Sequence, residues 1–200
     1  MADRYDVIVA GVGAMGSAAC YHLARRGKRV LGLERFSIPH AMGSSHGVNR
    51  IIRLAYYEDP SYVPLLRRAF ELWRNLEAGF GEQLLFVTGS LDISQRDHFV
   101  FRESLRSCEL HGLPHEVLSS AELSARYPAY VLPADYLAVL QPDGGFVASE
   151  RAIVAHVNGA LDAGADIHGH APVLSWETTS VGIRVKTSGG VYEADQLILS

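Results

Sequence analysis

The sequence has few features that would place the protein in a membrane or outside the cell. Its 200 residues include only two cysteines, Cys20 and Cys108, which lie in predicted helices without the spacing of a disulfide or metal site. No apolar run is long enough to span a membrane, and the charged N-terminus lacks the order of a secretory signal. We therefore expect two reduced, buried thiols and a cytoplasmic location, with a peroxisomal one left open.

Basic charge is also sparse and scattered. The 18 Lys and Arg residues are outnumbered by 22 Asp and Glu, which gives a formal net charge of −4. This balance disfavours a nucleic acid or an anionic membrane as partner. With 48% hydrophobic and 20% charged residues, the composition is that of a globular chain whose partner is a small molecule. It predicts no oligomeric state.

The N-terminal segment predicts a βαβ unit. An apolar strand at 5–10 leads through a glycine turn into a helix that runs through Leu23 and ends at Gly27, and a second strand follows at 29–34. Such a crossover is right-handed and joins parallel strands. The chain therefore begins with an α/β domain built on a parallel sheet.

The glycine turn has the signature of a dinucleotide site. Gly11 permits the tight turn, Gly13 admits a pyrophosphate against the backbone, and Gly16 lets helix and strand approach. Glu34 ends the next strand, where it can accept hydrogen bonds from a ribose, and its charge disfavours NADP despite the neighbouring Arg35. The glycines alone do not choose between FAD and NAD, and the alternative is a glycine-rich turn beside a surface glutamate.

Beyond residue 35 the pattern departs from simple α/β alternation. A loop is predicted at 36–47 and an extended segment at 49–56. Further helices are predicted at 61–78, 99–111 and 149–163, a short capped one starts near Ser119, and strands are predicted at 84–88, 91–94, 136–141, 173–177, 183–187 and 192–199. The last strand stops where an α/β protein would turn into its next loop, so we expect a segment of a longer protein.

The stretch from Pro39 to Tyr56 contains two arginines in an unusual setting. If 49–56 is extended, Arg50 and Arg53 point to opposite faces. One cation could favour a reduced flavin, and the other could bind a substrate carboxylate through paired hydrogen bonds. The alternative is a pair of surface arginines on an edge strand, and His46 alone would be an ordinary loop histidine.

This stretch resembles a known family. It reads Gly-Ser-x-His-Gly-x-x-Arg-Ile-Ile-Arg-x-Ala-Tyr from Gly43 to Tyr56, and with the preceding Pro-His pair and the N-terminal GxGxxG it closely resembles monomeric sarcosine oxidase and its relatives, N-methyltryptophan oxidase and pipecolate oxidase. The resemblance continues through Arg126-Tyr127-Pro128 and Asp143-Gly144-Gly145, so it covers essentially the whole chain.

The resemblance implies an FAD-dependent amine oxidase. The implied fold is a Rossmann-type FAD-binding domain with a parallel sheet, interleaved with an antiparallel α+β substrate domain. Residues 1–80 and 145–200 would form the first domain, and 81–144 part of the second. The implied substrates are a small secondary amino acid, N-methylated or cyclic, and oxygen, which would leave as hydrogen peroxide. An NAD-dependent dehydrogenase and a non-catalytic FAD-binding fragment stay as alternatives.

The resemblance also implies roles for individual residues. His46, Arg50 and Arg53 form the expected catalytic set, with Arg53 binding the substrate carboxylate. The expected cofactor-binding residues are Gly11, Gly13, Ala14, Met15, Gly16, Glu34, Arg35, Ser44, Ser45, His46, Arg50, Ile51 and, on the adenine side, Val173. No metal site is expected, because His168 and His170 lack a Cys, Asp or Glu partner and favour a turn.

The chain departs from the family's common pattern at several positions. Sarcosine oxidases commonly read His-His-Gly-Asp-Thr-Arg where this chain has Ser45 to Arg50, and they have His at the position of Leu54. These changes alter the polarity of the expected pocket. The family's flavin-linking cysteine, its lysine near the oxygen site and several substrate-pocket residues belong to a C-terminal half that these 200 residues do not contain.

Overall fold

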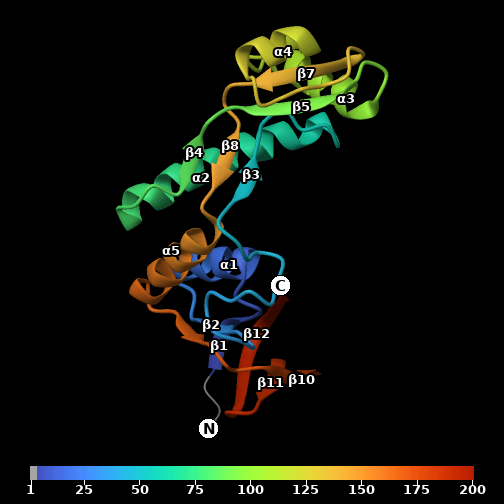
Figure 1. Cartoon of the computed structure of the whole chain (residues 1–200). Helices are drawn as coiled ribbons and strands as arrows, with labels where there is room; N and C mark the ends of the chain where they lie inside the picture. Colours follow the sequence, from blue (N-terminus) through green and yellow to red (C-terminus); the bar gives the residue numbers. More distant parts are fainter. Residues whose placement is uncertain (1–3) are drawn as a thin grey trace. The chain divides into compact units, whose positions relative to one another are not determined.

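The computed structural model describes residues 4–200, and their contacts divide the chain into two compact units. The first unit contains residues 4–49, Gly79–Glu82 and Ala148–Ser200, and the second contains Arg50–Ala78 and Gln83–Val147. Figure 1 labels most of the elements of both units, and each unit is described by itself below. No helix among residues 4–200 has the length and apolarity to cross a membrane.

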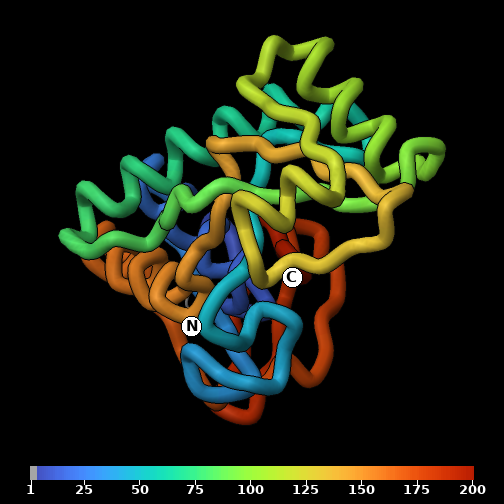
Figure 2. Tube along the Cα trace, turned by 45° about the horizontal axis from the view of Figure 1, so that its top comes forward, coloured from blue at the N-terminus to red at the C-terminus, as the bar shows by residue number. Residues whose placement is uncertain are grey.

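The first unit is built on a six-stranded sheet with the order β10-β11-β12-β1-β2-β9. Its strands are β1 (Arg4–Ala10), β2 (Val30–Leu33), β9 (Asp166–His168), β10 (Val173–Thr179), β11 (Gly182–Thr187) and β12 (Val191–Leu199). β12, β1, β2 and β9 run parallel, whereas β10 and β11 add an antiparallel edge. β1 and β12, the first and last strands of the described sequence, thus lie side by side, in blue and red in Figure 2.

Two helices of the first unit, α1 (Ala14–Ala24) and α5 (Ser149–Asp162), pack against each other. Their contact is close because Gly159 has no side chain: a Cβ there would lie 2.6 Å from the Tyr21 ring. In the sheet, Ile8 and Leu31 are fully buried, as apolar parallel strands require. The predicted βαβ unit and the predicted fold class are confirmed.

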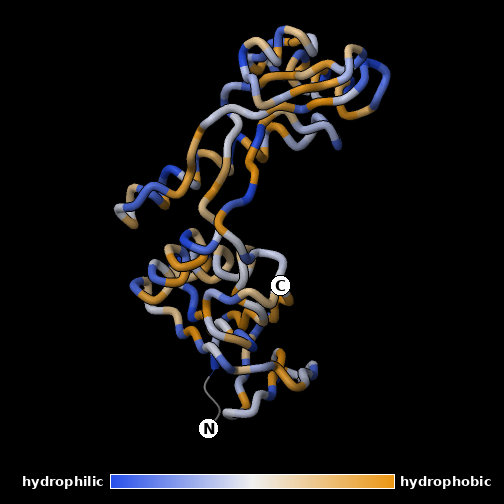
Figure 3. The backbone as a smooth tube through the Cα atoms, in the orientation of Figure 1, coloured by the Kyte–Doolittle hydropathy of each residue, from blue (hydrophilic) through white to orange (hydrophobic). Residues whose placement is uncertain are grey.

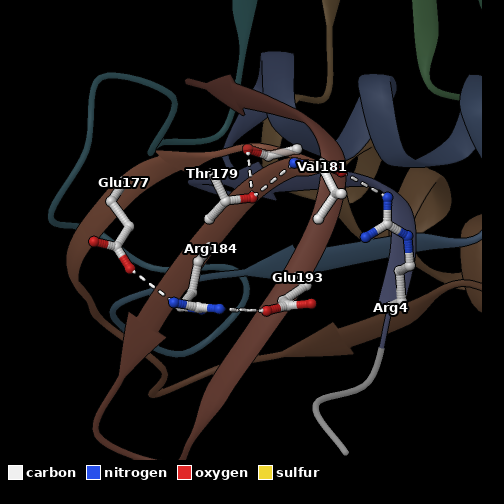
Figure 4. Close-up of polar contacts among 7 residues, drawn as sticks. Arg4, Glu177, Thr179, Val181, Arg184 and Glu193 are labelled. Atoms are coloured by element: carbon white, nitrogen blue, oxygen red, sulfur yellow. Dashed lines mark hydrogen bonds and ion pairs between the residues drawn. The ribbon is translucent and has the colours of Figure 1, made fainter.

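The antiparallel edge of this sheet is held in register by a row of charges. Glu177, Arg184 and Glu193 are direct neighbours across β10, β11 and β12, and Arg184 donates to both carboxylates at about 3 Å (Figure 4). Arg4 at the start of β1 donates to the carbonyl of Val181 at 2.8 Å. Exposed pairs of this kind add little stability, but opposite charges directly across strands disfavour a shifted register.

The second unit contains two antiparallel three-stranded sheets, with the orders β3-β8-β4 and β5-β7-β6. The strands are β3 (Arg50–Ile52), β4 (Leu85–Val87), β5 (Ser90–Gln95), β6 (Glu116–Ser119), β7 (Tyr136–Gln141) and β8 (Gly145–Val147). The helices are a short 3-10 turn (Pro60–Tyr62), α2 (Val63–Phe80), α3 (Phe99–His111) and α4 (Ser120–Arg126), which starts with the expected capping box. A hydrophobic stretch (orange in Figure 3) runs along β7.

The division into units differs from the expected one at residues 50–78, 81–82 and 145–147. We expected 50–78 and 145–147 in the FAD-binding domain, but they belong to the second unit, whereas 81–82, expected in the substrate domain, belong to the first. Leu54, Ala55 and Val63 are buried there in one cluster with Phe101 and Val139, which fixes this segment by apolar packing. The short strands β6, β8 and β9 were not expected either, because three or four residues show too little periodicity to be recognised.

The two cysteines are buried and free, as expected from the sequence. Burial raises the pKa of Cys20 to about 12 and that of Cys108 to about 11. A thiol with so high a pKa carries almost no reactive thiolate near neutral pH. Both side chains therefore act as small apolar packing groups.

The packed surface of α1 and α5 also buries a histidine. His156 is 7% exposed, and its ring lies 5.4 Å from the ring of Tyr21 and 6.2 Å from that of His22. Burial, and to a smaller extent the nearby His22, lower the pKa of His156 from 6.5 to about 4. Near neutral pH the imidazole is therefore uncharged, and acid must force a charge into this packed region.

We predict that this histidine makes the first unit sensitive to mild acid. The pKa of His156 is lower in the folded state than in the unfolded state. The free energy of unfolding is therefore unaffected by this group above about pH 6.5, and it decreases as the pH falls toward 4. Between pH 7 and pH 5 the loss is on the order of 2 kcal/mol. Urea unfolding of the wild type and of His156→Gln over this range measures it, and the variant should lose less stability. His168→Gln, at an exposed position, is the control; equal pH slopes for wild type and His156→Gln would contradict the assignment.

Candidate functional site

A pocket of about 770 Å³ opens in the first unit where β1 and β2 end and α1 begins. This size lies within the range of about 300–1,000 Å³ that is typical of small-molecule and cofactor sites. In open α/β sheets, ligands bind at this carboxyl edge of the strands. The expected site residues that line the pocket are Gly11, Gly13, Ala14, Met15, Glu34, Arg35, Ser44, Ser45 and Val173.

The turn between β1 and α1 depends on missing side chains. Gly11 has φ of +96°, and a Cβ there would lie 2.3 Å from the carbonyl oxygen of Ser200. A Cβ at Gly16 would lie 1.8 Å from the carbonyl oxygen of Gly11, so α1 packs directly on the turn. Gly16 does not line the pocket, which agrees with its expected role in bringing helix and strand together.

Gly13 differs from the other two glycines because it faces open space. A Cβ there would meet only the hydroxyl of Ser45, at 3.5 Å. Gly13 is also the N-cap of α1, which has neither a side-chain cap nor an acidic residue in its first turn. The amide of Ala14 donates to Ser45 Oγ at 3.2 Å. A helix start with this arrangement suits a phosphate, whose charge the unpaired amides and the helix dipole stabilise.

Glu34 joins the end of β2 to the glycine turn. It is 4% exposed. Its Oε2 accepts the amide of Val12 at 2.8 Å, and its Oε1 accepts the amide of Phe36 at 3.0 Å and lies 3.3 Å from His40 Nε2. A carboxylate has about four acceptor positions, so one is left for a hydroxyl in the pocket. The carboxylate is thus held in a fixed position at the wall of the pocket.

His40 is a pocket residue that was not among the expected site residues. Its Nδ1 accepts the amide of Met42 at 3.1 Å, and its ring lies 3.2 Å from the position of a Cβ on Gly43. The histidine therefore connects Glu34 to the 36–47 loop. The Pro-His pair was noted only as part of the family motif. Other pocket residues without any sequence signal are Val12, Pro172, Leu174, Ile153 and Ser200.

Besides Gly16, four further expected site residues do not line this pocket. His46 belongs to the first unit, where its Nδ1 lies 2.7 Å from the carbonyl oxygen of Gly43. Arg50, Ile51 and Arg53 belong to the second unit. The prediction of an extended segment over 49–56 is wrong beyond Ile52, where β3 ends, because the chain then enters the buried cluster of the second unit. The alternation argument for Arg50 and Arg53 therefore fails.

Arg53 lies among aromatic side chains. Its guanidinium carbon is 5.1 Å from the ring centre of Tyr56 and 4.5 Å from that of Tyr57. Its contacts with Glu58 are long, at 3.4 and 3.5 Å, and its buried Nε has no hydrogen-bond partner among the described residues. Such a guanidinium has donors left for an added carboxylate.

Asp92 on β5 is a buried carboxylate that no pattern in the sequence indicates. It accepts a hydrogen bond from Ser104 Oγ at 2.8 Å. Burial raises the pKa of Asp92, whereas the Ser104 hydrogen bond and the charge of Arg53 oppose the rise. Only the fold reveals this side chain, because an aspartate in an alternating strand is usually exposed. No group of three or more His, Cys, Asp or Glu that could hold a metal ion exists among residues 4–200.

Comparison with known proteins gives the family. Residues 6–200 match the family described as FAD dependent oxidoreductase. The chain belongs to this family. Among its relatives, the chain is 42% identical over 199 residues to monomeric sarcosine oxidase of Streptomyces avermitilis, covering 100% of this chain and 52% of that protein. It is 35% identical to N-methyl-L-tryptophan oxidase of Yersinia pestis, covering 98% of this chain and 53% of that one.

The solved structures agree with this membership. The open form of NikD, described as an unusual amino acid oxidase essential for nikkomycin biosynthesis, superposes with a TM-score of 0.89 at 30% identity, over 99% of this chain and 51% of that one. The chain thus spans about half the length of the relatives it matches. The expected resemblance and the expected cofactor, FAD, are confirmed, and the family favours FAD over the NAD alternative.

We predict that Gly13 and Gly16 respond differently to the same substitution. Gly13→Ala should raise the dissociation constant of ADP about tenfold, because the methyl group occupies pyrophosphate space, and should change stability by less than about 0.5 kcal/mol. Gly16→Ala should cost about 1–3 kcal/mol of stability, because its Cβ overlaps the Gly11 carbonyl. Calorimetric titration with ADP and thermal unfolding measure the two effects.

Gly79→Ala is the control for this pair, since a Cβ at Gly79 meets nothing within 4 Å and no positive φ is recorded there. It should leave ADP binding unchanged. Its stability should differ from that of the wild type only by the small gain in helix propensity from Gly to Ala. If Gly13→Ala binds ADP with the same affinity as the wild type, the pyrophosphate does not lie beside Gly13.

Proposed function

We propose that the protein acts as an FAD-dependent oxidase of secondary amino acids, either sarcosine-like N-methyl amino acids or cyclic imino acids. Bound FAD would take a hydride equivalent from the carbon next to the amine, leaving an imine that water hydrolyses, while oxygen is reduced to hydrogen peroxide. The relatives' names support this substrate class, because sarcosine and N-methyltryptophan are both N-methyl amino acids. The observation that carries the proposal is the pocket beside Gly13 and Glu34.

The residues of the first unit fit the ADP part of FAD. The open space at Gly13 and the uncapped start of α1 suit the pyrophosphate. The free acceptor position of Glu34 suits a ribose hydroxyl. Arg35 and Val173 line the same pocket, and we assign Val173 to the adenine side. Together these groups would bind and orient the cofactor without taking part in the chemistry.

The residues nearer the flavin are assigned on the family motif. We assign Ser44, Ser45 and His46 of the first unit to flavin contacts, and Arg50 and Ile51 of the second unit to the same role. A cation such as Arg50 would stabilise the negative charge that a flavin gains on reduction. His46 is held by the carbonyl of Gly43, which fixes its ring for such a contact.

Arg53 is the proposed carboxylate-binding residue. Its buried Nε has no partner among residues 4–200, and its contacts with Glu58 are long enough to yield to a stronger acceptor. A substrate carboxylate that accepts two hydrogen bonds from one guanidinium is oriented as well as bound. Orientation of the carbon that loses hydride is one of the contributions a protein makes to such a reaction.

A second candidate is a polypeptide that holds FAD without turning substrate over. It is favoured by one observation, namely that the chain spans about half the length of its matched relatives. The two candidates share the cofactor site and differ only in catalysis.

We predict that the purified protein binds FAD and forms peroxide. Mixed with FAD and freed of excess by gel filtration, it should keep the yellow flavin absorption, because the pocket holds the ADP part. With sarcosine or pipecolate and oxygen it should then yield hydrogen peroxide in a coupled peroxidase assay. Colourless protein that is stabilised by NAD would contradict the proposal. Yellow protein that forms no peroxide with any N-alkyl amino acid would favour the second candidate.

We predict that Arg53 acts mainly on substrate binding. In a preparation that forms peroxide, Arg53→Met should raise KM about tenfold to a hundredfold, because charge-assisted hydrogen bonds of about 1.5–3 kcal/mol are lost. Arg67→Met, which removes another arginine of the second unit, is the control. Steady-state kinetics with sarcosine measure the effect, and an unchanged KM would exclude the carboxylate role.

A further inference from the structure

Gly47, at the end of the 36–47 loop, is held at both of its backbone polar groups by neighbouring side chains of one helix. Its amide donates to Glu150 Oε1 at 2.8 Å, and its carbonyl oxygen accepts a hydrogen bond from Ser149 Oγ at 2.6 Å. The three residues belong to the first unit. We call this arrangement the Gly47 clamp.

The clamp uses side chains that would ordinarily stabilise the helix they belong to. Serine and glutamate are favoured at helix starts because they accept hydrogen bonds from free amides of the first turn. The N-cap of α5, however, is Ala148, and no side chain caps the helix. Ser149 is only 6% exposed and donates its hydroxyl to Gly47 instead. The start of α5 is therefore built to hold the loop.

Gly47 is suited to be held in this way. Its φ of +102° lies in the region that favours glycine, so the backbone can present its amide and its carbonyl to adjacent side chains. With both groups satisfied, the peptide planes on either side of Gly47 are fixed in direction. The clamp thus sets the course of the chain immediately after His46.

The same loop is anchored at a second point. Ser45 Oγ accepts the amide of Ala14 at the start of α1, and the ring of His46 contacts the carbonyl of Gly43. Residues 43–47 are therefore fixed between the starts of two helices, α1 on one side and α5 on the other. Gly43, Ser44 and Ser45 form part of the pocket wall. Without the clamp, Ser45 would keep its hydrogen bond to Ala14 beside the glycine turn, whereas the chain from His46 onward would lose its anchor on α5.

We propose that Ser149 and Glu150 are positioning residues for the cofactor. They hold residues 44–46 in the conformation in which these meet FAD beyond its ADP part. This inference rests on the proposed function, because it takes FAD as the ligand of the loop. The ADP part is bound by the glycine turn and Glu34, which the clamp does not touch. Loss of the clamp should therefore weaken FAD binding and spare ADP binding.

The test compares FAD with ADP in variants of the clamp. Glu150→Ala and Ser149→Ala should each raise the dissociation constant of FAD about tenfold, and that of ADP by less than about twofold. The visible circular dichroism of bound flavin should change as well, because the groups around the ring move. Glu150→Gln keeps an oxygen that can accept the Gly47 amide, so it should restore wild-type affinity and spectrum. Ser149→Ala removes a single oxygen atom, and it provides the same comparison of FAD and ADP binding if Glu150→Ala does not fold.

Asp6→Ala is the matched control, because Asp6 accepts the amide of Arg29 at 2.8 Å in the same unit but away from the pocket. It should bind both ligands as the wild type does. Wild-type protein that fails to bind FAD would overturn the proposed function and this inference with it. If the wild type binds FAD and the clamp variants bind it equally well, the inference is overturned and the proposed function is not. If the clamp variants bind FAD and ADP more weakly to the same extent, Ser149 and Glu150 have a structural role only, and this result would also overturn the inference.

Discussion

The first unit depends on the contact between α1 and the turn that precedes it. The carbonyl of Gly11 lies where a Cβ of residue 16 would be, so the helix begins against the end of β1. Glu34 strengthens this geometry by joining the next strand to the amide of Val12. The pocket, the position of the start of α1 beside it and the fixed carboxylate of Glu34 all follow from these contacts. Without them the strand ends would carry no organised site.

The 36–47 loop extends this arrangement to the start of a second helix. Hydrogen bonds between α1 and Ser45 and between α5 and Gly47 give the loop a fixed course although it has no regular secondary structure. Loops placed by rigid elements commonly carry ligand contacts. In the second unit, Arg53 has a different setting, between tyrosine rings and near the buried Asp92. In the proposed function the two units would supply different kinds of contact, one to a dinucleotide and the other to a small anion.

The sequence predicted those parts of the structure that depend on interactions between residues close together in the chain. The strand at 5–10, the turn at Gly11 and the acidic residue at Glu34 follow from hydrophobic pattern and from the demands of a pyrophosphate on the backbone. The pocket confirms that these residues lie together. The choice of FAD came from the motif between Gly43 and Tyr56, because the glycine turn alone is shared by several dinucleotides.

Contacts between distant parts of the sequence could not be predicted. The Gly47 clamp joins residues 102 and 103 positions apart, and nothing in the spacing of Ser149 and Glu150 indicates their partner. The membership of residues 50–78 in the second unit depends on burial of Leu54 and Val63 against α3 and β7. Asp92 is recognisable as unusual only once its burial is known. In each case tertiary packing decides what local pattern leaves open.

The central claim, that the pocket between Gly13 and Glu34 holds the ADP part of FAD, is tested most directly by a crystal structure of the protein grown with FAD. We predict electron density for the pyrophosphate at the start of α1, with a ribose hydroxyl within hydrogen-bonding distance of the Glu34 carboxylate. Density for the ADP part elsewhere, or a ribose out of reach of Glu34, would contradict the account.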